Sequence, residues 1–194
     1  MVDFFRKNGY FVIRMCTTQL AMTVFGLILS ASTYRHDVLF VLSSVLAAGM
    51  YLWLLYTMCW EVGIKDKVRL DGGRIVYQPL CMLWVSLVAN ALNFLLCVLS
   101  IFGCAFVRDF EDASPVWAAS LYKLSHDIFQ LIHSMYGGIV NSIVNASVHP
   151  MWNSLLLLVT VLPAMGACVA GYNMGIHNRT LGSFVGIKPR FDRR

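Results

Sequence analysis

Four long apolar stretches constrain this chain more than any other feature of its sequence. They run from about residue 9 to 31, 38 to 60, 83 to 107 and 151 to 172. A helix needs roughly 20 residues to cross ~30 Å of hydrocarbon, and each stretch is close to that length. Backbone groups in lipid must bond within their own segment, so such stretches predict helices. The sequence therefore predicts an all-α membrane protein with a four-helix transmembrane bundle.

The composition favours the same conclusion. Of 194 residues, 58% are hydrophobic and 13% are charged, and the mean hydropathy is +0.67. Soluble domains usually carry about 25% charged residues. We therefore expect one integral membrane domain over residues 1–194, with the lipid bilayer as its main partner. The net charge is +5, but the basic residues are scattered between apolar stretches, which argues against a nucleic-acid partner.

The distribution of Lys and Arg predicts the orientation. If both termini and the loop between the second and third spans share one side, that side holds eleven basic residues and the other holds three. Basic residues are enriched in cytoplasmic loops. We therefore expect a multi-pass protein of the cell membrane with both termini in the cytoplasm. The first group is Arg6, Lys7, Lys65, Lys67, Arg69, Arg74, Arg179, Lys188, Arg190, Arg193 and Arg194, and the second is Arg35, Arg108 and Lys123.

The long segment between the third and fourth spans has a helical pattern of its own. Within residues 115–148, apolar side chains recur at spacings of three and four, which predicts a helix with one apolar face. The recurring residues are Trp117, Leu121, Leu124, Ile128, Leu131 and Met135. Gly137 and Gly138 interrupt the pattern and are a candidate hinge.

Three structures fit this outer segment. It can be an amphipathic helix in the outer interface, a re-entrant helical hairpin bent at the two glycines, or an extra span over residues 128–148. The extra span would place the basic C-terminal tail outside, against the charge rule, and would bury His133, Asn141 and Asn145. We expect an interfacial or re-entrant segment.

The loop after the second span has two interpretations. Residues 68–70 and 75–77 flank Asp71-Gly72-Gly73-Arg74, a sequence typical of a tight hairpin turn. An isolated two-stranded hairpin is marginal in water, so it would need to pack on a partner or on the membrane face. A simple connector is an equal alternative.

Parts of the chain resemble a known class of proteins. The run from Asp71 to Leu80, then Ser86-Leu87-Val88-Ala89-Asn90, and Gly171-Tyr172-Asn173-Met174-Gly175 are similar to small uncharacterised membrane proteins of Gram-positive bacteria. The resemblance covers about a quarter of the chain. It implies a multi-helix membrane fold and no assigned activity.

Polar residues inside the apolar stretches are candidates for function. On the third span, a seam of small and polar residues includes Ser86, Asn90 and Asn93. The seam can line a polar path, together with Asn141 and Asn145 of the outer segment, or it can be a helix-packing face in which the amides bond between helices.

The other spans carry candidates for packing and for bending. Gly26 on the first span is a candidate packing residue, as are Ala167, Gly171 and Gly175, which recur every four residues on the fourth. Pro163 is a candidate kink because it removes a backbone hydrogen bond.

Arg14 lies inside the first span on its cytoplasmic side. Its side chain can extend to the lipid headgroups, or it can pair with an acidic lipid, substrate or partner. No acidic residue lies deep in any predicted span, so no internal counter-ion is expected.

Signatures of chemistry are lacking in the sequence. It has no Cys-x-x-Cys pair, no His-Glu-x-x-His motif, no Gly-x-Ser-x-Gly elbow and no phosphate-binding glycine loop. We therefore expect no catalytic residue, no metal and no cofactor. The favoured hypothesis is a non-enzymatic subunit or accessory of a membrane complex, or a homo-oligomer. The alternative is a small oligomeric transporter or channel whose path the asparagines of span three line.

Overall fold

The computed structural model describes residues 2–106, 116–143 and 150–179, and no strand occurs among them. The all-helical prediction is therefore confirmed for these parts of the chain. The elements are α1 (Val2–Thr33), α2 (Asp37–Asp71), α3 (Cys81–Ala89), α4 (Ala91–Phe106), α5 (Val116–Ile132), the 3-10 helix η1 (Ser134–Tyr136), α6 (Gly137–Ile143), α7 (Pro150–Val159) and α8 (Val161–Ile176).

Three of these helical stretches are long and apolar enough to cross a membrane. They are Gly9–Thr33, Asp37–Asp71 and Trp152–Ile176. The pair α3 and α4 passes the same test when taken as one span with a bend of 53°. Side chains on these helices point outward, since only 22%, 28% and 33% of the most apolar window of each stretch is buried. An apolar surface of this extent is suited to lipid, not to water.

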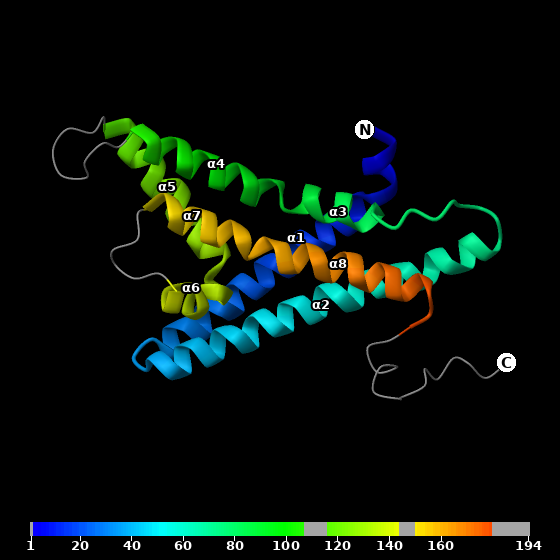
Figure 1. The fold of residues 1–194 in the computed structure, drawn as a ribbon, viewed down its shortest axis with the longest axis horizontal. Helices are drawn as coiled ribbons and strands as arrows, with labels where there is room; N and C mark the ends of the chain where they lie inside the picture. The colour runs from blue at the N-terminus through cyan, green and yellow to red at the C-terminus, as the bar shows by residue number, and fades with distance from the viewer. Residues whose placement is uncertain (1, 107–115, 144–149, 180–194) are drawn as a thin grey trace.

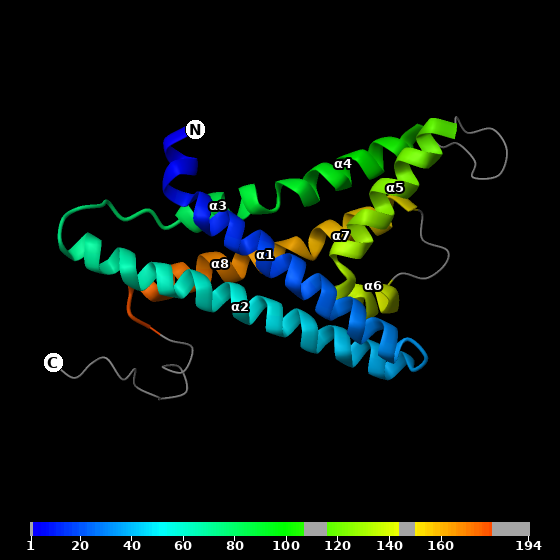
Figure 2. The same ribbon diagram turned by 180° about the vertical axis from the view of Figure 1, so that it is seen from behind.

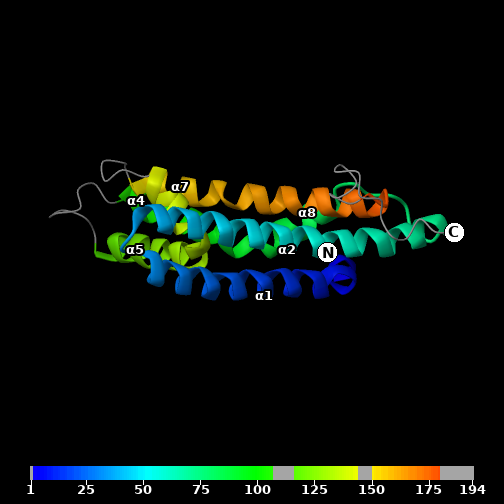
Figure 3. The ribbon, with the colours of Figure 1, turned by 90° about the horizontal axis from the view of Figure 1, so that it is seen from below.

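The helices form layers around α2. Because α1 and α8 both pack on α2, the second helix lies between the first and the last (Figures 1 and 3). The ends of the long helices gather at two poles (Figure 1). One pole has the start of α1, the connection from α2 to α3 and the end of α8. The opposite pole has the α1–α2 turn, the end of α4 and the starts of α5 and α7.

The closest helix contact joins α2 to α8, and glycines make it possible. A Cβ added to Gly175 would lie 3.0 Å from the Cα of Gly63 and would collide with the carbonyl oxygen of Trp60. A Cβ on Gly171 would collide with the carbonyl of Tyr56. Gly171 and Gly175 therefore lie where the two backbones meet, as small residues do in membrane helix pairs. Ala167, four residues earlier, is half-buried.

The third predicted span is not continuous. Its helix breaks at Asn90, between α3 and α4. The Asn90 side chain donates to the carbonyl of Ser86 at 2.8 Å, and the Asn90 backbone N–H bonds the same carbonyl. The side chain and the backbone thus share one carbonyl at the residue where the helix breaks, and such side-chain bonds favour a bend. The apolar pattern predicted the span but could not reveal this local bond.

Of the two interpretations of residues 68–77, the hairpin is wrong and the connector agrees with the structure. Residues 68–70 continue α2, which ends at Asp71, and residues 75–77 form no strand. Gly73 has a φ of +68°, which ends the helix. The following connection is fastened to α8, since the Tyr77 hydroxyl donates to Oδ1 of Asn173 at 2.8 Å and the Asn173 amide donates to the Pro79 carbonyl at 3.3 Å. Two of the segments that carry the resemblance thus meet in space.

The glycine contact generates the first prediction. Gly175→Ala should destabilise the fold by about 1–3 kcal/mol, because the added methyl forces α2 and α8 apart. Gly166→Ala on the same helix is the matched control, since a Cβ there meets no atom within 4 Å. Unfolding midpoints in detergent measure the difference. Equal midpoints for the two variants would contradict the α2–α8 packing.

Candidate functional site

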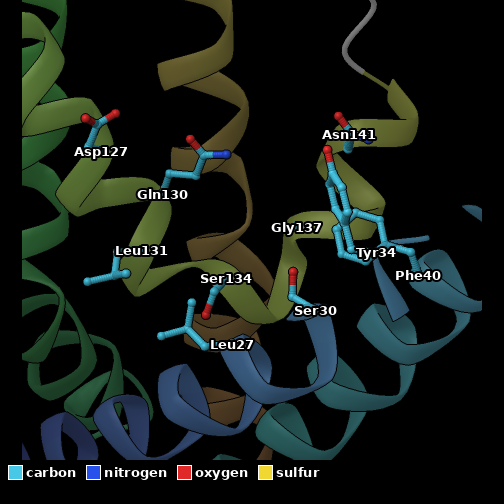
Figure 4. Close-up of a pocket in the computed structure, with 10 residues that line it drawn as sticks. All are labelled: Leu27, Ser30, Tyr34, Phe40, Asp127, Gln130, Leu131, Ser134, Gly137 and Asn141. Atoms are coloured by element: carbon cyan, nitrogen blue, oxygen red, sulfur yellow. The ribbon is translucent and has the colours of Figure 1, made fainter. Parts of the chain in front are cut away.

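The main candidate site is a cavity of about 430 Å³ beside α5 and α6. Figure 4 shows that its walls come from α1, the α1–α2 turn, the start of α2, α5, η1 and α6. Asp127, Gln130 and Asn141 are its most polar members. The other lining residues are Leu27, Ser30, Tyr34, Phe40, Leu131, Ser134 and Gly137. The cavity volume lies within the range of small-molecule sites.

A break between α5 and α6 shapes this cavity. The His133 backbone N–H and the imidazole Nδ1 both bond the carbonyl of Phe129, at 3.1 Å each. α5 ends at Ile132 and η1 follows. The break therefore precedes the candidate hinge, and Gly137, with φ −52° and ψ −45°, is itself helical. The expected bend at Gly137 and Gly138 is displaced to residues 133–136, where the imidazole shares the Phe129 carbonyl with the backbone N–H.

α1 holds the broken segment in place. The Thr23 hydroxyl donates to the Ile132 carbonyl at 2.8 Å, and the Ser134 hydroxyl donates to the Thr23 carbonyl at 3.0 Å. Gly26 lies under the backbone of Met135, where a Cβ would come within 2.6 Å of the Met135 nitrogen. Gly26 thus packs against η1, not against another long helix.

α2 holds α6 in a similar way. The Gly138 N–H donates to the Ser44 hydroxyl at 2.8 Å, and a Cβ on Gly138 would collide with the carbonyl of Phe40. The second glycine is needed for close approach to α2. Figure 2 shows α1 and α2 converging toward the turn that joins them, with α6 close to this end of both helices.

A smaller cavity of about 70 Å³ adjoins the first one. Gln130, Gly137 and Asn141 line both cavities, and His133 and Asn153 line the smaller one. The volume leaves room for a few water molecules. Polar groups therefore continue from the open cavity to a buried imidazole.

A chain of buried polar groups joins α4, α5 and α7. The Asn153 amide nitrogen lies 3.1 Å from Nε2 of His126, and Nδ1 of His126 lies 3.3 Å from the Ser154 hydroxyl. Because the amide nitrogen donates, Nε2 accepts and Nδ1 carries the proton. The hydroxyls of Ser154 and Ser100 are 2.7 Å apart. Ser154 is fully buried, so this serine–histidine pair joins helices and lacks access for a substrate.

Both imidazoles are held neutral. Burial lowers the pKa of His126 and of His133, since the charged ring loses its hydration. Neither residue belongs to one of the candidate spans. The two rings therefore act as hydrogen-bonding groups and not as fixed charges at neutral pH.

The predicted polar path is not assembled as one feature. Ser86, Asn90 and Asn93 are buried, and the Asn93 amide donates to Oδ1 of Asn90 at 2.8 Å, so these groups bond within their own span. Asn141 lies in the open cavity instead. Asn145 lies outside the described residues.

Arg14 has a counter-ion that the sequence did not suggest. Its guanidinium lies 3.6 Å from the Glu61 carboxylate on α2, and both side chains are partly exposed. Together they border a second cavity of about 350 Å³ between α1 and α2, with Thr17, Thr18 and Thr57. The expectation of no internal partner for Arg14 is therefore wrong, because Glu61 follows the second apolar stretch directly and α2 continues through it.

Pro163 marks a further interruption. α7 ends at Val159 and α8 begins at Val161, so the break lies just before the proline. The ring of a proline clashes with the carbonyl four residues earlier, here that of Val159. The Thr160 hydroxyl donates to the Leu157 carbonyl at 2.6 Å beside the break. Pro163 also lines an apolar cavity of about 280 Å³ with residues of α6.

The apolar face predicted for the outer segment points outward in part. Trp117, Leu124, Ile128 and Leu131 are exposed, while the buried face of α5 consists of Ala118, Ser125, His126 and Phe129. This second face packs on α4, where a Cβ on Gly103 would come within 2.7 Å of the Tyr122 nitrogen. A single amphipathic stripe does not describe α5, because its contact with α4 buries a second face of mostly small and polar residues while much of the apolar stripe stays exposed.

Sequence reasoning missed the cavity residues of α1 and α2. Nothing in the sequence marked Tyr34 and Phe40 as cavity residues, because they flank the turn between α1 and α2. Only the packing of α6 on α2 brings α5 close to them. Among the described residues, no group of three or more His, Cys, Asp and Glu side chains is placed to hold a metal ion.

The features above define an all-helical protein with three or four helices fit to span a membrane and a polar cavity beside a broken helix pair. Comparison of the chain with protein-family models, with curated proteins and with solved structures found no match.

The buried polar chain generates the second prediction. Ser154→Ala should lower the free energy of unfolding by about 1–3 kcal/mol, because the buried partner groups of Ser100 and His126 lose a bond. Ser120→Ala, on the exposed side of α5, is the control and should leave the stability unchanged. Unfolding in a detergent series measures both. A loss no larger than that of the control would show that the chain of bonds does not hold α7.

Proposed function

We propose that this chain is an integral membrane protein that binds a small polar solute in the cavity between α1, α2, α5 and α6, as a component of transport or sensing. Four spans cross the bilayer: α1, α2, the bent pair α3–α4, and α7–α8. The α5–α6 pair is a re-entrant segment that enters and leaves on one side.

The distribution of charge supports this topology. The start of α1, the end of α2 with its connection to α3, and the end of α8 lie at one pole (Figure 1), and among the described residues these segments carry seven basic side chains. They are Arg6, Lys7, Lys65, Lys67, Arg69, Arg74 and Arg179. The α1–α2 turn and α5, in the other half, carry Arg35 and Lys123. The positive-inside rule then assigns the first pole, with both termini, to the cytoplasm. The cavity opens on the outer half.

The observation that carries the proposal is the depth at which α5 and α6 meet. η1 contacts Thr23 and Gly26, which lie inside the span Gly9–Thr33. Polar side chains such as Gln130 and Asn141 are therefore carried below the membrane surface. Unpaired polar groups are costly in lipid, and a water-filled or solute-filled cavity removes that cost.

The cavity can be tested by thiol chemistry. In a cysteine-free background, Gln130→Cys should react with a membrane-impermeant thiosulfonate reagent added from outside. Val24→Cys is the control, because Val24 lies at similar depth on α1 and faces outward without lining the cavity. The rate at Gln130→Cys should exceed the rate at Val24→Cys at least about tenfold, since thiosulfonates react with hydrated thiolates. Equal reaction rates of the two cysteine variants would contradict the proposal of a water-filled cavity.

A second candidate function is association with other membrane proteins, as a subunit or as a homo-oligomer. The favouring observation is that Gly49 on α2 and Gly166 on α8 point outward, with no atom within 4 Å of an added Cβ. Small residues on a lipid-facing surface allow a second helix to approach closely. The two candidates are compatible, because a solute site in a small protein can work inside an oligomer.

Association predicts an oligomeric mass that depends on these glycines. In nanodiscs or mild detergent, the native chain should run as a multiple of 21.8 kDa, and Gly166→Leu should shift it toward the single-chain mass. Val159→Leu, also at an exposed position, is the control and should keep the oligomer. A single-chain mass for the native protein, with no copurifying partner, would argue against this candidate.

A further inference from the structure

We propose that the ligand of the outer cavity is an organic cation: an ammonium group, supplied by a free amine or by a lipid headgroup, with Asp127 as its counter-ion. This inference rests on the proposed solute-binding function and names the chemical class of the solute.

The charge of the lining selects a cation. Asp127 is the one charged side chain among the ten residues that line the cavity, and no Lys, Arg or His is among them. Within the described parts of the chain, the ion pairs are Arg14–Glu61 and Arg69–Asp66, so the Asp127 carboxylate is not neutralised by a described residue. An anionic solute would meet repulsion here without any compensating cation.

The aromatic wall selects an organic cation. Tyr34 and Phe40 lie across the cavity from α5, which carries Asp127 (Figure 4). Their ring centroids are 6.4 Å apart with an interplanar angle of 73°, so the two rings present differently oriented surfaces. Aromatic rings attract alkylammonium groups through their electron-rich faces.

The remaining lining suits the rest of such a molecule. Leu27 and Leu131 offer apolar contacts to alkyl groups, and the amides of Gln130 and Asn141 offer carbonyl acceptors to N–H or O–H donors. A bare metal ion fits less well, because hard cations take six or more oxygen ligands and this lining supplies one carboxylate. A volume of about 430 Å³ is also far larger than a metal ion requires.

Choline and its neutral carbon isostere, 3,3-dimethylbutan-1-ol, test the proposal directly. The full chain in maltoside micelles is titrated with each compound by calorimetry. Choline should bind at least about tenfold more tightly than the alcohol, because charge-assisted contacts are worth that much. Equal affinities, or no binding of choline, would overturn the cation assignment.

Two variants test whether the Asp127 carboxylate is the counter-ion of the bound cation. Asp127→Asn should weaken choline binding about tenfold to a hundredfold. Asp37→Asn is the matched control: Asp37 is an exposed acid in the first turn of α2, near the same pole, and does not line the cavity. It should leave the affinity unchanged. Native affinity in Asp127→Asn would overturn the proposal, and unchanged unfolding midpoints verify that both variants are folded.

Bilayer composition distinguishes the two sources of the ammonium group. In phosphatidylglycerol nanodiscs choline should bind. If phosphatidylcholine nanodiscs weaken that binding, a lipid headgroup occupies the site, and if they do not, the ligand is a free amine. The absence of choline binding in phosphatidylglycerol nanodiscs would overturn the proposal.

The thiol test separates this inference from the proposed function. Reactive Gln130→Cys without choline binding means that the solute cavity stands and the cation assignment fails. If Gln130→Cys does not react, both the solute cavity and the cation assignment are overturned.

Discussion

In the described parts of this protein, three helix interruptions each have a polar side chain that bonds a backbone carbonyl of the turn before it. Asn90 bonds the carbonyl of Ser86, His133 bonds that of Phe129, and Thr160 bonds that of Leu157. In an apolar environment an unpaired carbonyl costs several kcal/mol. Side-chain bonds of this kind are known to bend helices. The bends in turn bring together residues that lie far apart in the chain.

The break at His133 has the largest consequence. It lets α5 end inside the bundle and lets α6 turn back toward the pole from which α5 came (Figure 1). Thr23 of α1 and Ser44 of α2 supply the bonds that hold the turn, and Gly26 and Gly138 supply the space. Each of these contacts joins residues more than 90 positions apart. The polar cavity exists because these contacts form together.

The polar groups of the α4–α7 region are of two kinds. Those of the chain from Asn153 to Ser100 bond one another, and Ser100, His126 and Ser154 are buried, so they join α4, α5 and α7. Those of the cavity, such as Asp127 and Gln130, remain open to a ligand. Burial, and not residue type, distinguishes the polar groups that join helices from those that line the cavity, since serine and amide side chains occur in both settings.

Hydropathy alone was enough to predict helices over the apolar stretches, because a stretch of about 20 apolar residues has no other stable form in lipid. Three of these stretches lie in long apolar helices, and the stretch over residues 83–107 is a helix pair bent by 53°. Gly171 and Gly175 were recognisable as packing candidates because small residues four positions apart lie on one face of a helix. They lie where α8 meets α2. The break at Asn90, the partner of Arg14, and the placement of Tyr34 and Asp127 around one cavity followed from none of these patterns. They depend on which helix faces which, and that choice is made by contacts between segments far apart in the chain, which no local period encodes.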